Sequence, residues 1–93
     1  MKREEIIGKT VIGSLKLFNK EKILINEIEV IGQIMDIDDE KGIIVCNHDT
    51  KQAIGLPVVL EAFKPAEQGY YQMKSGAKIK NPDLLCDMAI IKN

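Results

Sequence analysis

The chain has 93 residues, of which 45% are hydrophobic, and its 13 basic and 14 acidic side chains give a formal net charge of −1. The apolar content excludes intrinsic disorder, which goes with few apolar residues and a high net charge. Proteins that neutralise nucleic-acid phosphates usually carry a basic excess, whereas Arg3 is the only arginine here. We therefore expect one folded domain over residues 1–93 and consider nucleic acid a poor candidate partner.

The cellular location is predicted from the cysteines and the apolar runs. Cys46 and Cys86 are the only cysteines, and they lie far apart in the chain. A secreted domain of this size often relies on two or more disulfides. We find no signal-peptide pattern at the start of the chain and no apolar run near the roughly 20 residues that a membrane span needs. These features favour the cytoplasm, with reduced thiols and no membrane association.

The apolar residues favour strands over helices. Ile and Val together number 20, against 7 Leu. Branching at Cβ stiffens the side chain, which costs little on a pleated sheet and more in a helix. The composition therefore predicts a mainly β fold.

The first half of the chain predicts a bent series of strands. Residues 1–8 form either a short helical turn closed by Gly8 or an extended lead-in. Residues 9–18 read as a strand in which Gly13 marks a bend or a close backbone approach. Residues 23–37 form a long β stretch whose apolar parity changes near Asn26 and Glu27, which indicates a bulge or a change of strand.

Turn signals divide the remainder into short segments. A charged turn over residues 36–42 joins the long stretch to a strand at 43–46, and Gly42 is free to adopt the positive φ of a hairpin turn. A polar turn at 47–51 then leads to a strand at 52–56, which Pro57 ends. Residues 58–63 form a helical turn or an irregular crossing. Ser75-Gly76 predicts a hairpin between 70–74 and 77–80, and the turn Asn81-Pro82-Asp83 precedes a last strand over 84–91.

Together these segments predict a small, strongly bent antiparallel barrel of the SH3-like or Sm-like kind, or alternatively a compact sandwich. Six or seven short strands with turns every eight to twelve residues are typical of both architectures.

Several of these motifs resemble those of a group of small uncharacterised bacterial proteins. The shared features are an N-terminal Gly8-Lys9-Thr10-Val11 strand, the hairpin that begins Gly69-Tyr70-Tyr71, and the Asn81-Pro82-Asp83 turn. The chain departs from that pattern where Val58 and Val59 replace a proline and an acid, and where Met88 replaces a tryptophan. The resemblance implies a fold and a bacterial origin, and it implies no activity.

Candidates for catalysis or metal binding are weak. His48 and Asp49 are adjacent in a polar turn, where neighbouring side chains point in different directions, so they do not form a dyad. Cys46, His48 and Cys86 fall short of the four closely spaced ligands of a structural zinc site. The acidic residues after Asp36 do not match the spacing of a calcium loop. We therefore expect no catalytic site, no cofactor and no metal.

Charge is distributed unevenly along the chain and indicates candidate partner surfaces. Residues 27–40 contain six acids and no base, whereas residues 64–80 contain four lysines and one acid. Such asymmetry steers encounters between proteins, and one tyrosine of the hairpin can add an interface anchor. The candidate surface consists of Glu27, Glu29, Asp36, Asp38, Asp39, Glu40, Tyr71, Lys74, Lys78 and Lys80.

These features lead to three functional hypotheses. The first is a non-enzymatic protein-binding or assembly module, which includes a toxin-neutralising partner protein, with self-association through exposed strand edges. The second is an Sm-like RNA-binding protein, which depends on fold analogy alone. The third is an enzyme or small-ligand binder that uses His48, Asp49 and Tyr71.

Overall fold

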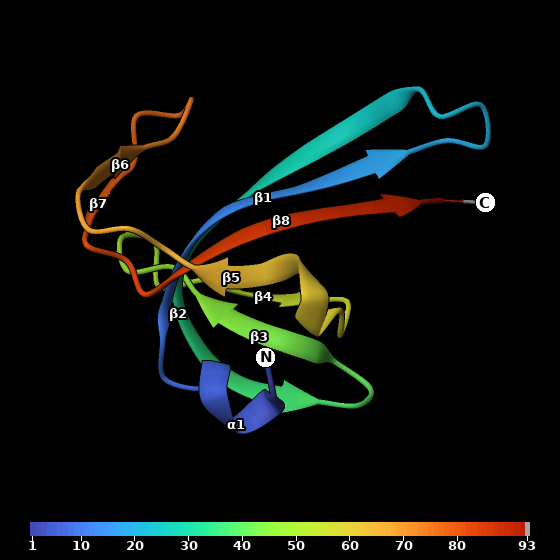
Figure 1. Cartoon of the computed structure of the whole chain (residues 1–93). Helices are drawn as coiled ribbons and strands as arrows, with labels where there is room; N and C mark the ends of the chain where they lie inside the picture. Colours follow the sequence, from blue (N-terminus) through green and yellow to red (C-terminus); the bar gives the residue numbers. More distant parts are fainter. Residues whose placement is uncertain (93) are drawn as a thin grey trace.

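The computed structural model describes residues 1–92 and contains one long bent sheet with a separate hairpin (Figure 1). In chain order the elements are α1 (Arg3–Ile6), β1 (Thr10–Phe18), β2 (Leu24–Asp38), β3 (Gly42–Cys46), β4 (Ala53–Leu56), the 3-10 helix η1 (Leu60–Ala62), β5 (Phe63–Pro65), β6 (Tyr70–Gln72), β7 (Lys78–Lys80) and β8 (Leu84–Ile91). The predicted mainly β character and the predicted strand positions are confirmed.

Six strands form the main sheet in the order β4-β3-β2-β1-β8-β5, and β6 pairs with β7 in a second, two-stranded sheet. Among the described residues the sheet is therefore open, and β4 and β5 are its two edge strands. β2 connects the two halves of the sheet, because β1 pairs with it from Leu24 to Gln33 and β3 pairs with it from Gln33 to Asp38.

The first and last strands are parallel neighbours. The β1–β8 ladder runs without interruption from Val11 and Leu84 to Phe18 and Ile91. Parallel neighbours need a long crossover connection, whereas antiparallel neighbours can be joined by a hairpin. Here the crossover is almost the whole chain, so no local turn signal could reveal it. The prediction of an antiparallel arrangement is therefore wrong for this pair.

Buried side chains from every strand of the main sheet and from α1 form one core. The ladder brings Leu15 beside Met88, and Val11 beside Leu84, so alternate residues of β1 and β8 share the core face. The buried cluster contains Ile6, Val11, Leu15, Val30, Ile34, Ile43, Val45, Leu56, Phe63, Leu84, Cys86 and Met88. The part of the chain that the structure describes buries no polar or charged residue.

Two glycines allow the strands to approach closely where the sheet bends. A Cβ on Gly13 would overlap the carbonyl oxygen of Cys86, and one on Gly32 would overlap that of Cys46. Both partners are backbone atoms, which cannot move aside as a side chain can. The predicted close backbone approach at Gly13 is therefore confirmed.

The expected change of parity in the long strand is a bulge. The β1–β2 register shifts between Leu17 and Phe18, where Leu24 and Asn26 are the partners and Ile25 is left out. A second shift in the β2–β3 ladder leaves Met35 out. Each extra residue moves the following side chains to the other face of the sheet.

The Asn81-Pro82-Asp83 turn fastens the start of β1 to the start of β8. The backbone N–H of Thr10 donates to Asp83 Oδ2 at 2.9 Å, and the Thr10 hydroxyl donates to the same oxygen at 3.1 Å. These bonds, the backbone bond first, lower the pKa of the Asp83 carboxyl because they favour its charged form. The turn therefore fixes the parallel pair at its N-terminal end.

None of the helices in residues 1–92 has both the length and the apolar character needed to cross a membrane.

Gly13→Ala is expected to lower the free energy of unfolding by about 1–3 kcal/mol, as overpacking of a tight contact does. Chemical denaturation monitored by circular dichroism measures the change. The matched control is Ser14→Ala on the opposite face of β1, which should change stability by no more than about 0.5 kcal/mol. Equal losses of unfolding free energy in Gly13→Ala and Ser14→Ala would contradict a close approach of the β8 backbone to Gly13.

Asp83→Asn is expected to lower stability at neutral pH. A depressed folded-state pKa contributes stability above the unfolded-state value of about 3.9, and that contribution is lost as pH falls through the folded-state pKa. The difference between wild type and Asp83→Asn should therefore shrink below about pH 4 in denaturation curves recorded across pH. Asp49→Asn in the exposed turn at 47–51 serves as control, and a pH-independent difference for Asp83→Asn would argue against the carboxylate's role.

Candidate functional site

The tip of the β6–β7 hairpin folds back onto the outer face of the sheet, where it meets two acids of β2. The Ser75 N–H donates to Glu29 Oε1 at 3.1 Å and the Ser75 hydroxyl donates to Oε2 at 2.5 Å. Lys74 Nζ lies 3.7 Å from Glu27 Oε2. Glu27 and Glu29 lie two residues apart, so both side chains leave the same face of β2. The predicted acidic and basic surfaces thus contact each other within one chain.

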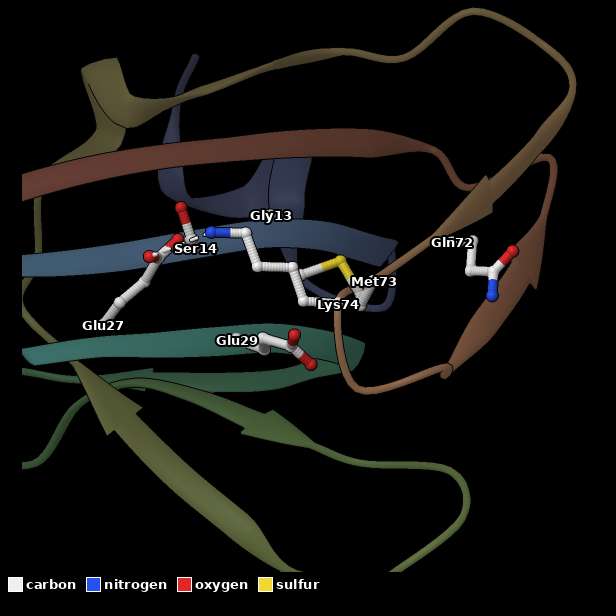
Figure 2. Close-up of a pocket in the computed structure, with 7 residues that line it drawn as sticks. All are labelled: Gly13, Ser14, Glu27, Glu29, Gln72, Met73 and Lys74. Atoms are coloured by element: carbon white, nitrogen blue, oxygen red, sulfur yellow. Dashed lines mark ion pairs between the residues drawn. The ribbon is translucent and has the colours of Figure 1, made fainter.

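A hollow of about 320 Å³ lies between the sheet and the hairpin (Figure 2). Figure 2 shows the Lys74 side chain reaching over Gly13 and Ser14 toward Glu27. The lining residues are Gly13, Ser14, Glu27, Glu29, Gln72, Met73 and Lys74. Both glutamates are already engaged by the hairpin, and the lining includes no histidine or cysteine. The hollow therefore holds a contact between the hairpin and the sheet.

The outer face of the hairpin carries one exposed aromatic ring and two lysines. Tyr70 is 76% exposed, and Lys80 Nζ lies 5.5 Å from the centroid of its ring, within cation–π range. Lys78 is also exposed, and its side chain lies on the same face of β7 as that of Lys80. The hydroxyl of Tyr71, in contrast, donates to the Glu67 carbonyl at 2.8 Å, and its side chain is half-buried. Tyr70 is therefore the exposed tyrosine, while Tyr71 holds the loop before the hairpin.

The other four candidate acids lie at the far end of β2. Asp36 follows the second bulge, and Asp38, Asp39 and Glu40 form the β2–β3 turn. The Asp38 carboxylate accepts the backbone N–H groups of Glu40 and Lys41, and these bonds, that from Lys41 first, lower its pKa. Arg3 pairs with Asp39 at 2.8 Å. The acidic segment is therefore two separate groups, one that binds the hairpin and one that shapes a turn.

The residues considered for catalysis or metal binding are not brought together. His48 and Asp49 are exposed in the turn after β3, and they line none of the three hollows described for this chain. Cys86 is buried on β8, and burial raises the pKa of its thiol to about 11, with a smaller contribution from Asp87. That thiol stays protonated at neutral pH and is a poor nucleophile. Within residues 1–92 no group of three metal-ligating side chains lies together.

The strand edges contain a feature that the sequence did not predict. β5 pairs with β8 only at Leu84–Cys86, so among the described residues no strand pairs with the far side of β8 beyond Cys86. In Figure 1 the end of β8 and the β1–β2 hairpin project together, away from β3 and α1. The second half of β8 therefore has a paired strand on one side only, and on the other side the 3-10 helix η1 approaches it without strand pairing.

The direction of the backbone groups on this half of β8 follows from one hydrogen bond. The Lys92 N–H donates to the Phe18 carbonyl of β1 at 2.7 Å. Backbone groups alternate in direction along a strand, so those of residues 87, 89 and 91 point away from β1. We call this side, made by Asp87, Ala89 and Ile91, the free edge of β8.

Exposed apolar side chains lie next to the free edge. The register places Leu24, Phe18 and Ile91 side by side on three strands, and Ile91 is 55% exposed. A mostly apolar hollow of about 300 Å³ lies here, lined by Phe18, Lys22, Ala89, Ile90 and Ile91. We call Phe18, Ile23, Leu24, Ile25 and Ile91 the apolar tip. The apolar tip and the free edge adjoin at this hollow, and no strand of the described residues pairs with the free edge.

Ser75→Ala is expected to raise the amide hydrogen-exchange rates of residues 70–80 about fivefold, the size expected from losing a hydrogen bond worth about 1 kcal/mol. Rates in β1 and β3 should stay unchanged, because the hairpin is a separate sheet. Lys74→Ala is the control, since its exposed ion pair contributes little. Unchanged exchange in Ser75→Ala would show that the Glu29–Ser75 contact does not hold the hairpin.

No protein-family model matches the chain, and comparisons with curated proteins and with solved structures likewise found no match.

Proposed function

We propose that the chain is a non-enzymatic protein-binding or assembly module that accepts a strand on the free edge of β8. The observation that carries the proposal is the unpaired half of β8 beside the apolar tip. A strand edge offers a row of N–H and C=O groups to a second strand, and proteins use such edges for recognition by strand addition. The side chains next to the edge would then select an apolar partner.

The energetics favour a partner strand over a small ligand. Backbone hydrogen bonds would fix the orientation of the added strand, while burial of the apolar tip would supply about 25 cal/mol for each Å² removed from water. The hollow beside Phe18 is open and has few polar groups to orient a small molecule, which binding sites usually supply.

The hairpin provides a second, charged contact surface. Lys78 and Lys80 are exposed and form no ion pair among the described residues, whereas Lys74, which is also exposed, pairs with Glu27. Exposed lysines around an aromatic ring attract acidic groups and affect the rate of encounter more than the final affinity. An acidic protein with an apolar strand is therefore the partner that fits both surfaces, and a toxin neutralised by this chain in the cytoplasm is one form of such a partner.

An Sm-like barrel that binds RNA is the second candidate function. The exposed Tyr70 ring with Lys78 and Lys80 favours it, because nucleic-acid bases stack on aromatic rings next to cations. The net charge of −1 and the single arginine oppose it. The protein-binding proposal is therefore preferred.

Ile91→Asp is expected to weaken partner binding at least about tenfold, since it places an unpaired charge in an apolar contact. The tagged protein is used for affinity capture from source cells, and the captured partner is then purified and its Kd measured by calorimetry. Ala53→Asp on the β4 edge is the matched control and should leave the Kd unchanged. Equal Kd values for wild type and Ile91→Asp would refute docking at β8, and recovery of RNA in place of protein would favour the second candidate.

A further inference from the structure

The two outer strands of the sheet are both protected against strand addition. β4 has four residues and is followed directly by Pro57, and β5 has three residues and ends at Pro65. Short edge strands and prolines are the usual means of preventing pairing with another chain. The free edge of β8 contains no proline, and it therefore differs from the two formal edges.

Another unpaired stretch of the main sheet, on β2 before Gln33, is also unsuitable for strand addition. Glu27 and Glu29 project from it and are held by the hairpin, and the bulge at Ile25 interrupts its register. A bulge leaves one residue unpaired and twists the strand locally. The free edge of β8 is therefore the one edge of the main sheet in the described residues that combines regular geometry with apolar side chains.

The sequence of this edge is self-complementary in the antiparallel direction. A two-fold axis at Ile90 places Ala89 of one copy opposite Ile91 of the other, and Ile90 opposite Ile90. Ala89 and Ile91 both present their backbone groups to the edge, so the two facing pairs would exchange about four hydrogen bonds. Asp87 lies beyond these pairs and stays in water.

The side chains on both faces support this register. On the outer face the row Leu24–Phe18–Ile91 continues into Ala89 of the second copy. On the opposite face Ile90 of one copy meets Ile90 of the other across the axis, with Leu17 beside each, and pairs of branched residues are favourable neighbours in antiparallel strands. A register centred on Ala89 would place Asp87 against Ile91 and is less favourable. With a net charge of −1, repulsion between two copies is small.

We propose that the partner strand is β8 of a second copy, so that the chain forms a two-fold symmetric dimer through antiparallel β8–β8 pairing centred on Ile90. The proposal rests on the proposed function and names its partner. The two sheets then join into one continuous sheet across the axis, and the two free edges cover each other.

A charge-exchange experiment tests the identity of the partner. Sedimentation equilibrium over a wide concentration range should show a monomer–dimer transition for wild type. A89K/I91K and A89E/I91E each place like charges opposite one another, which should weaken dimerisation at least about tenfold. An equimolar mixture of the two should regain the dimer, because Lys then faces Glu. A53K/I54K on β4 is the control and should dimerise as wild type does.

Cysteine cross-linking tests the register of the β8–β8 pair. Opposed residues in a non-hydrogen-bonded antiparallel pair lie close enough for a disulfide, so Ile90→Cys should form a cross-linked dimer under mild oxidation. Ala89→Cys, whose counterpart is Ile91, should not. Cross-linking of Ala89→Cys in preference to Ile90→Cys would overturn the Ile90-centred register.

A wild-type chain that stays monomeric throughout, or a mixture that does not regain the dimer, overturns the second copy as the partner. The outcome for the proposed function is separate. A monomer whose capture of a different protein is weakened by Ile91→Asp retains the binding function and loses only the self-association. If the chain is monomeric and Ile91→Asp does not change the Kd for the captured partner, both the self-association and the proposed binding at β8 are refuted.

Discussion

The parallel pairing of β1 with β8 is the interaction on which the rest of the structure depends. It joins the first and last strands of the sheet over eight residue pairs, from Val11–Leu84 to Phe18–Ile91. Gly13 lets the two backbones approach, and Asp83 fastens their N-terminal ends. Without this pair, β5 and β8 would have no link to the β1–β4 meander, and the core would lose Leu84, Cys86 and Met88.

The same pairing explains why a strand edge is left open. β1 has nine residues and β8 has eight, whereas β5 has three. A long strand next to a short one must have an unpaired half, and here that half, residues 87–91, fully buries only Met88. Packing therefore determines the core end of β8, while its outer end is available for a partner. Ile23, Leu24, Ile25 and Ile91 at that end are all exposed, and such a gathering of apolar side chains is unusual for a surface with no function.

Local signals in the sequence predicted the strands and turns well. Ser75-Gly76, Asn81-Pro82-Asp83 and Gly42 each specify a conformation through the chemistry of one to three residues, and all three turns are present. The close approach at Gly13 was also predictable, because a strand tolerates the loss of a packing side chain mainly where a neighbouring backbone needs the space. The two helical segments, where the sequence left alternatives open, are the short α1 and η1.

Pairing between distant residues could not be predicted in this way. The parallel ladder joins β1 to β8 across almost the whole chain, and nothing in either strand specifies its partner. For the same reason the charges were interpreted as two separate surfaces, although Glu29 and Ser75 lie 46 positions apart and bond to each other. The free edge was missed because an unpaired edge is a property of the neighbouring strands and has no signal in the residues of β8 themselves.

The two surfaces of the chain differ in their physical character, and this difference bears on how a partner would bind. The hairpin surface acts through exposed charges, which salt screens within about 10 Å at moderate ionic strength. The free edge would act through backbone hydrogen bonds and apolar contact, which depend little on salt. Because the Glu29–Ser75 contact fixes the hairpin on the outer face of β2, both surfaces belong to the same sheet. In the proposed complex, lysines on the hairpin would therefore increase the rate of encounter, while the edge of β8 would determine how long the complex lasts.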